Sequence, residues 1–197
     1  EQLAVTEGLL YRRGNFNGTG DQLIVDALME VQGADLAFSP GFRWGTTLLP
    51  GQPITREWLM DMTATTYSYA TLSEMKGEMI KTVLEDVCDN LFNPDPYYQQ
   101  GGDMVRVGGL AYICNPTAAM GQRISDMRLK GELIDPAKTY KVAGWAPVAE
   151  DAAKAGNPMV WDQVEQWLKA RGGKIAPRKV NMPKLVGGVL PNPGFAG

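Results

Sequence analysis

The segment that constrains the fold most is a stretch of helical periodicity that ends at a cluster of prolines. Apolar residues recur every three or four positions after Gly77 and form one stripe, namely Ile80, Val83, Leu84, Val87 and Leu91. This spacing predicts an amphipathic helix over residues 77–91 with one face on a core. The sequence NPDP at residues 93–96 then ends the helix, because proline lacks the amide hydrogen that a helix interior requires. The chain has to turn here before a following element can return along the helix.

Three further segments also have helical character. Apolar positions spaced by three and four predict a helix over residues 21–31, and Thr19 with Gln22 forms a capping-box pattern at its start. Thr55 is expected to cap a short helix that runs to about residue 62. The last helix is expected over residues 160–171, before a pair of glycines.

The strands are expected between these helices. Alternation and β-branched or aromatic composition predict strands at residues 34–38, 67–75, 104–114, 123–133 and 140–145. Scattered helices and strands without an internal repeat predict the α+β class, as a single domain with a mixed β-sheet flanked by helices. We expect its core to span about residues 9–176, and the Pro/Gly-rich residues 177–197 to form an extended tail.

Composition excludes several classes of function. The 197 residues are 44% hydrophobic and 21% charged, which is ordinary for one globular domain. A net charge of −3 provides no basic stripe, so we expect no nucleic-acid partner. No apolar run approaches the roughly 20 residues of a membrane helix, so we expect no membrane span.

The sequence contains no histidine. Without imidazole, the chain has no proton shuttle of the usual kind near neutral pH and no Ser-His or Cys-His nucleophile. Histidine-rich zinc and dimetal sites are excluded as well. Any metal chemistry associated with this chain must therefore come from elsewhere.

The two cysteines, Cys88 and Cys114, lack the spacing of a metal site. They are either buried free thiols or, in an oxidising compartment, a disulfide. Cys88 lies late on the expected helix 77–91, and Cys114 ends the strand that follows. A short return of the chain therefore predicts that they come close enough to bridge.

A series of motifs resembles a known family. Arg12-x-x-Asn15, a helix ending in LIVDAL, the strand ADLAFS, a glycine loop ending at Arg43 and the string GQPIT occur in this order. The strings KGEMIKTVLEDV, GGDMVRVGGLAY and AKTYKVAGW continue the pattern. Together they resemble the C-terminal domain of the 5'-nucleotidase family over about residues 9–148. Longer strings such as FSPGFRWGTTLLPGQPIT and LEDVCDNLFNPDPYYQQGGDMVRVGGL look like its SoxB subfamily, the thiosulfohydrolases of bacterial sulfur oxidation.

The resemblance implies a periplasmic hydrolase of two domains. An N-terminal metallophosphoesterase domain would hold a dinuclear manganese site, and this chain would be the C-terminal half, without a cofactor of its own and inactive alone. The implied substrate is a cysteine S-thiosulfonate on the flexible arm of the SoxYZ carrier protein, from which water releases sulfate. The implied partners are thus the metallophosphoesterase domain and the carrier arm.

The resemblance also implies a set of substrate-binding residues. Arg12 and Arg43 match arginines that bind anionic or hydroxyl groups in nucleotidases, and a guanidinium fork suits the oxygens of a sulfonate. Asn15 matches the same motif, and it either binds ligand or shapes the turn. Trp145 falls near a base-stacking aromatic residue. For the two arginines, the alternative is that they form ion pairs within the protein.

Other residues are candidates for contacts in the cleft or with the carrier arm, namely Trp44, Tyr67, Tyr98 and Gln100. Aromatic residues at strand ends are more often packing residues, and the loop at residues 97–102 is equally consistent with a tight surface turn. Phe38 replaces the asparagine that begins the nucleotidase NGGGIR loop, so nucleosides are expected to bind poorly. Two alternatives remain open, the C-terminal domain of a nucleotide or sugar-nucleotide hydrolase and a stand-alone periplasmic binding module.

Overall fold

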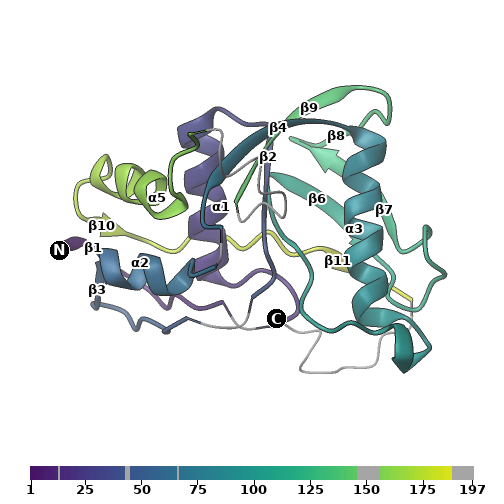
Figure 1. Ribbon diagram of the computed structural model, residues 1–197, viewed down its shortest axis with the longest axis horizontal. Coiled ribbons are helices and arrows are strands. Elements are labelled where there is room, and N and C mark those ends of the chain that lie inside the picture. Colours follow the sequence, from purple (N-terminus) through teal and green to yellow (C-terminus); the bar gives the residue numbers. More distant parts are fainter. Residues whose placement is uncertain (13, 43–44, 66, 146–155, 188–197) are drawn as a thin grey trace.

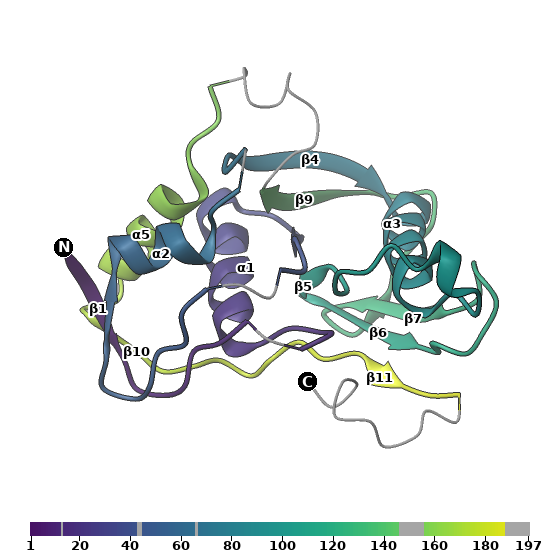
Figure 2. The ribbon, with the colours of Figure 1, turned by 60° about the horizontal axis from the view of Figure 1, so that its bottom comes forward.

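The computed structural model describes residues 1–12, 14–42, 45–65, 67–145 and 156–187. At its centre lies α1 (Thr19–Gln32), as Figures 1 and 2 show. One side of α1 packs against α5 (Val160–Lys169), and another packs against a four-stranded sheet. The helix forms because its apolar residues Ile24, Ala27 and Leu28 share one buried face.

The central sheet has the strand order β4-β9-β2-β5. These strands are β4 (Ala70–Lys76), β9 (Thr139–Trp145), β2 (Leu36–Ser39) and β5 (Arg106–Gly108). β2 and β9 are parallel, whereas β4 and β5 run antiparallel to their neighbours. The sheet is therefore mixed, and the carboxyl ends of β2 and β9 meet at one edge.

Two smaller sheets complete the structure. One has the order β11-β6-β7-β8 and consists of β11 (Lys184–Leu185), β6 (Leu110–Cys114), β7 (Ile124–Leu129) and β8 (Glu132–Leu133). The helix α3 (Gly77–Phe92) lies alongside β7. The other sheet has the order β10-β1-β3 and consists of β10 (Lys174–Ile175), β1 (Gln2–Thr6) and β3 (Pro53–Thr55). In the chain, β3 leads directly into α2 (Arg56–Met62). A short 3-10 helix, η1 (Pro96–Tyr98), follows α3.

The structure confirms the predicted α+β class and all four helices. Thr55 caps α2 as expected, because its side chain accepts a hydrogen bond from the amide of Trp58. The predicted start of α1 was wrong in detail. Thr19 is already helical, and the cap is Gly18, whose amide donates to Oδ2 of Asp21 at 2.8 Å. The expected strand at residues 104–114 is divided into β5 and β6, with Gly109 at a φ of 78° between them.

The tail is extended where the structure describes it, up to residue 187. It runs from α5 past α1 to β6, where β11 adds a parallel strand (Figure 2). Asn181 anchors it, since its side chain donates to the carbonyl of Leu110 at 2.6 Å and accepts from the amide of Gly109. Arg178 pairs with Asp26 and with Glu30 on α1. None of the described helices is long and apolar enough to cross a membrane.

Candidate functional site

The candidate site lies where two parallel strands end side by side. β2 ends at Ser39 and β9 ends at Trp145, and the two strands pair with Leu36 opposite Val142. Ligand-contacting groups in sheet-and-helix folds gather at such carboxyl ends. Residues 39–42, which begin with the last residue of β2, are called the 39–42 loop below, and Arg43 follows them directly in the sequence.

A hollow of about 390 Å³ opens on the sheet beside this loop. Its lining is mainly apolar, with three hydroxyl groups, and consists of Phe38, Ser39, Pro40, Thr71, Ser73, Met75, Val83, Val105, Val142, Ala143, Gly144 and Trp145. The hollow is large enough for a small group or a short piece of chain. No ionisable side chain is among these lining residues, so a charge on a ligand would have to be met from the rim.

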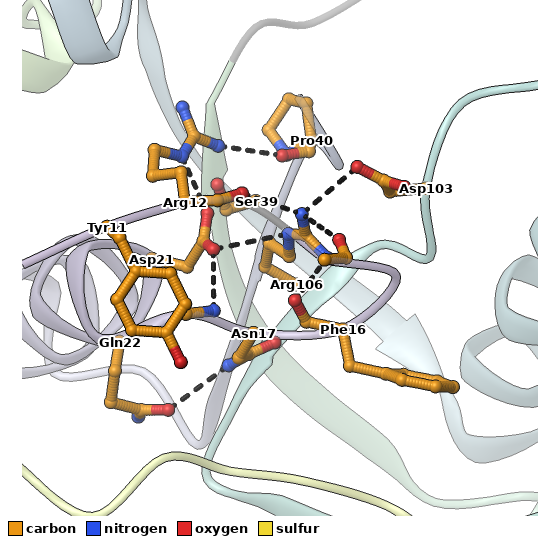
Figure 3. A network of polar contacts seen from close by, with 12 residues as sticks. Tyr11, Arg12, Phe16, Asn17, Asp21, Gln22, Ser39, Pro40, Asp103 and Arg106 are labelled. Carbon is orange, nitrogen blue, oxygen red and sulfur yellow. Dashed lines mark hydrogen bonds and ion pairs between the residues drawn. The ribbon is translucent and has the colours of Figure 1, made fainter. Parts of the chain in front are cut away.

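Behind the loop lies a buried network of charged groups, which Figure 3 shows around the carboxylate of Asp21. Nε of Arg12 donates to Oδ1 of Asp21 at 2.6 Å, and Nε of Arg106 lies 3.3 Å from Oδ2. Arg106 also pairs with Asp103 at 3.2 Å. All four side chains are almost completely inaccessible to solvent. Two arginines and two aspartates thus balance their charges inside the protein.

Several backbone carbonyls complete the network. Arg12 donates to the carbonyls of Pro40, at 2.9 Å, and of Met62. Arg106 donates to the carbonyls of Gly14, at 2.8 Å, and of Phe16. The two guanidinium groups therefore join α1, the segment before it and the 39–42 loop.

Asp21 accepts hydrogen bonds on both carboxylate oxygens. Burial raises the pKa of this carboxyl, whereas the charges of Arg12 and Arg106 and the hydrogen bond from the Gly18 amide lower it. Nε of Arg12 and the Gly18 amide donate to its two oxygens, and the charge of Arg106 lies 3.3 Å away, so the geometry matches the ionised form. The carboxylate is therefore the acceptor that both arginines require.

This geometry supports the interpretation of Arg12 as an ion-paired residue. Its side chain is 1% exposed, and its guanidinium binds the protein's own carboxylate and carbonyl groups. It also lies 5.7 Å from the ring centroid of Trp145 and 5.9 Å from that of Phe42. The predicted convergence of Arg12 with Arg43 on one anion stays a prediction, because Arg43 and Trp44 lie outside the described residues.

Trp145 lines the hollow, and its role in substrate binding stays a prediction. Its indole nitrogen donates to Oγ of Ser39 at 2.8 Å, so the end of β9 is tied to the end of β2. Its ring meets that of Phe42 edge-on at 5.9 Å between centroids. Trp145 is only 4% exposed. It therefore forms part of the wall of the hollow and also fixes the start of the 39–42 loop.

The remaining candidates are spread over a wider area. The backbone carbonyl of Asn15 accepts a hydrogen bond from the amide of Met104 at 3.0 Å, and the role of its side chain stays a prediction. Tyr67 is half-buried ahead of β4, outside the lining of the hollow. Tyr98 is 58% exposed, and Gln100 is exposed as well.

A second hollow, of about 490 Å³, is bordered by the other two residues of the 39–42 loop. It is lined by Gly41, Phe42, Asn90, Leu91, Gln99, Gly101 and Gly102. Gln99 and Gly101 line this hollow, whereas Tyr98 and Gln100 do not. Gly101 and Gly102 have φ angles of 81° and 88°, and their open surroundings leave the backbone accessible.

Asp21, Arg106, Asp103 and Ser39 are not among the site residues predicted from the sequence. The sequence places Asp21 at the start of the predicted helix, where an acidic residue is a common N-terminal signal that gives no hint of buried partners. Arg106 did have such a signal, since an arginine amid the apolar residues of an expected strand requires a buried partner.

The described residues do not fit a metal centre. No group of three or more cysteine, aspartate or glutamate side chains in this part of the chain could hold a metal ion. The acidic groups nearest the loop, Asp21 and Asp103, are already paired with arginines. No chemical step is therefore assigned to a metal bound by these residues.

Replacing Gly41 with alanine is expected to destabilise the protein by about 1–3 kcal/mol, the usual cost of overpacking. A Cβ atom at this position would lie 2.5 Å from the carbonyl oxygen of Met104 and 2.7 Å from that of Asp103. Because these are backbone atoms, the 39–42 loop itself would have to move. Denaturant unfolding measures the change in free energy.

Gly144→Ala is the matched control, since Gly144 lines the hollow beside this loop. Its nearest neighbours would be Oγ1 of Thr71 at 3.2 Å and the carbonyl oxygen of Phe38 at 3.5 Å, so a cost under about 1 kcal/mol is expected. Equal losses in the two variants would show that the contacts of Gly41 do not fix the loop.

Comparison with known proteins identifies the architecture. The model of the 5'-nucleotidase C-terminal domain matches residues 10–155. The chain belongs to the 5'-nucleotidase family. The matched region contains the whole central sheet and the 39–42 loop of this 5'-nucleotidase C-terminal domain. No curated protein matched the sequence.

Solved structures agree with this assignment. Sulfate thiohydrolase SoxB from Thermus thermophilus, in complex with glycerol, is 37% identical over 98% of the chain, with a TM-score of 0.87. NAD nucleotidase from Haemophilus influenzae is 18% identical over 96% of the chain, with a TM-score of 0.73. A 5'-nucleotidase precursor, also from Thermus thermophilus, is 17% identical over 94%, with a TM-score of 0.69. The two nucleotidases show the shared fold alone.

The 5'-nucleotidase C-terminal domain described here spans only part of each relative. It covers 36% of the SoxB chain, 38% of the NAD nucleotidase chain and 39% of the 5'-nucleotidase precursor. The similarity therefore does not by itself extend to the activity of a complete protein that contains this domain.

Proposed function

We propose that this domain is the substrate-recognition part of a periplasmic thiosulfohydrolase. The observation that carries the proposal is the similarity to SoxB, at 37% identity across nearly the whole chain, compared with 18% or less for the two nucleotidases. In the complete protein, a metallophosphoesterase domain with a dinuclear manganese centre would supply the hydrolytic machinery. This domain would supply the surface that receives the substrate.

The proposed substrate is a cysteine S-thiosulfonate on the arm of the SoxYZ carrier. Water adds a hydroxyl group to the sulfonate sulfur, the bond between this sulfur and its neighbouring sulfur breaks, and sulfate leaves. The carrier keeps the neighbouring sulfur as a persulfide, which takes up the remaining proton of the water molecule. The reaction exchanges no electrons with an outside oxidant or reductant.

The surroundings of the 39–42 loop support this proposal. Its two hollows are mostly apolar, and the second is lined by backbone-accessible glycines and by amide side chains. An uncharged, extended peptide arm matches this lining, because amide groups pair with peptide groups. Arg43, directly after the loop, would meet the sulfonate, and Trp145 would form part of the wall.

The test uses the complete protein with both domains. It is supplied in parallel with SoxYZ carrying the S-thiosulfonate, with AMP and with a sugar nucleotide, and the release of sulfate or phosphate is measured. We expect sulfate release from the carrier with a kcat/KM roughly 100-fold or more above that for either nucleotide, since Phe38 replaces the asparagine of the nucleotidase loop. A larger kcat/KM for a nucleotide would favour a nucleotide hydrolase, and binding of the carrier without turnover would favour a binding module.

A further inference from the structure

The two cysteines lie next to each other in the interior, although 25 residues separate them in the sequence. Sγ of Cys88 on α3 is 3.8 Å from Sγ of Cys114 at the end of β6, and both are free thiols. Figures 1 and 2 both show α3 beside the sheet that contains β6 and β7. The sulfurs would have to approach by only about 1.8 Å to reach the length of a disulfide bond.

Contacts on both sides of the pair hold α3 in register with this sheet. Glu85, one helical turn before Cys88, accepts from the amides of Gly121 and Ile124, each at 2.8 Å. Asp89, directly after Cys88, pairs with Arg123 at 2.6 Å. Positions 85, 88 and 89 share one helix face, so the thiol is directed at the sheet by its neighbours.

The folded protein shields both sulfurs. Cys88 and Cys114 are 0% exposed, and no lining of a described hollow includes them. The hydrogen bond between the two thiols, together with burial, raises the pKa of Cys88, whereas the same hydrogen bond lowers the pKa of Cys114. Burial alone therefore keeps an oxidant away from either sulfur once α3 has packed. Any reaction of the pair therefore belongs to the stage of folding at which α3 and β6 approach each other.

We propose that Cys88 and Cys114 are a site of oxidation, at which a disulfide-bonded oxidant joins the two sulfurs during folding. The thiolate of one cysteine attacks the oxidant, forms a mixed disulfide and releases the first oxidant thiol. The thiolate of the other then attacks the protein sulfur of the mixed disulfide, which forms the bridge and releases the second oxidant thiol. Two electrons pass to the oxidant, and the two protons of the cysteines end on its two thiols.

The bridge would close a segment that contains the exposed part of the second hollow. Residues 89–113 include η1 and the glycines that face the 39–42 loop. Tyr97 is 87% exposed and Tyr98 58% exposed within this segment. Oxidation would therefore tie both ends of the segment and leave its tyrosines accessible to a protease.

The experiment refolds the complete protein from denaturant, either with glutathione disulfide and glutathione or with dithiothreitol. After oxidative refolding, we expect a linked peptide that joins Cys88 to Cys114, lighter by two hydrogen atoms than the two reduced peptides together. Limited chymotrypsin cleavage at Tyr97 or Tyr98 should give fragments that stay joined until dithiothreitol separates them. In Cys88→Ala, the fragments should separate without reduction.

The outcomes are distinguishable from those of the activity assay, because none depends on turnover. Two free thiols after oxidative refolding, or glutathione attached to each cysteine separately, would overturn the proposal. So would cleaved fragments that separate before reduction. The wild-type peptide map decides the question by itself if the variant does not fold.

Discussion

Replacing Asp21 with asparagine is expected to lower the free energy of unfolding by about 3–5 kcal/mol, because it breaks a buried ion pair from one side. Asp21 uses one oxygen for Arg12 and the other for Arg106 and the Gly18 amide. Asparagine has one oxygen, so its NH₂ group would face a donor in either orientation. Arg12 would then lack its carboxylate, whereas Arg106 would keep Asp103.

Asp162→Asn is the matched control for this prediction. Oδ1 of Asp162 is 2.6 Å from Nη2 of Arg56, and the two side chains are 47% and 38% exposed. Solvent screens this pair, so the same change there should cost less than about 1 kcal/mol. Urea unfolding of both variants measures the difference. A loss at Asp21 no larger than that at Asp162 would contradict a stabilising role for the buried network.

The helices could be predicted from the sequence because their signals are local. In α3, the apolar stripe and the prolines after it determine one buried face and one end without reference to distant residues. The closeness of Cys88 and Cys114 was predicted for the same reason, since one helix and one returning strand bring them together. Their Sγ atoms are indeed 3.8 Å apart.

The short strands could not be predicted in this way. β10 and β11 each have two residues, too few for an alternating pattern. β10 exists because it pairs with β1, and β11 exists because it pairs with β6. The tail therefore contains a strand that depends on a partner about 70 residues earlier in the chain.

The buried network was missed because its members are far apart in the sequence. Arg12, Asp21 and Arg106 come from three separate segments, and helical periodicity carries no information about a charge on the buried side. The resemblance to nucleotidases directed attention to Arg12 as a ligand residue. The geometry indicates instead that Arg12 holds the 39–42 loop from behind through Pro40 and Phe42.

This arrangement separates the expected roles of the two arginines. Arg12 contacts the loop from the interior, so its replacement should act mainly on stability. Arg43 follows the loop in the sequence and is the cation we propose for the sulfonate. In the complete protein, Arg43→Ala is expected to lower kcat/KM for the loaded carrier roughly 10- to 150-fold, the equivalent of a charge-assisted contact of about 1.5–3 kcal/mol.

Steady-state assays of sulfate release, together with the melting temperature, test this separation. Arg43→Lys should recover part of the activity, because it restores the charge but not the paired donors of the guanidinium. Arg128→Ala removes an equal charge from an exposed pair with Asp126 and should change neither quantity appreciably. Arg43→Ala could instead lower the melting temperature as much as Arg12→Ala does and leave the turnover of the folded fraction unchanged. This result would show that Arg43 stabilises the fold and does not bind the substrate. Direct binding of the sulfonate would then have to come from another residue.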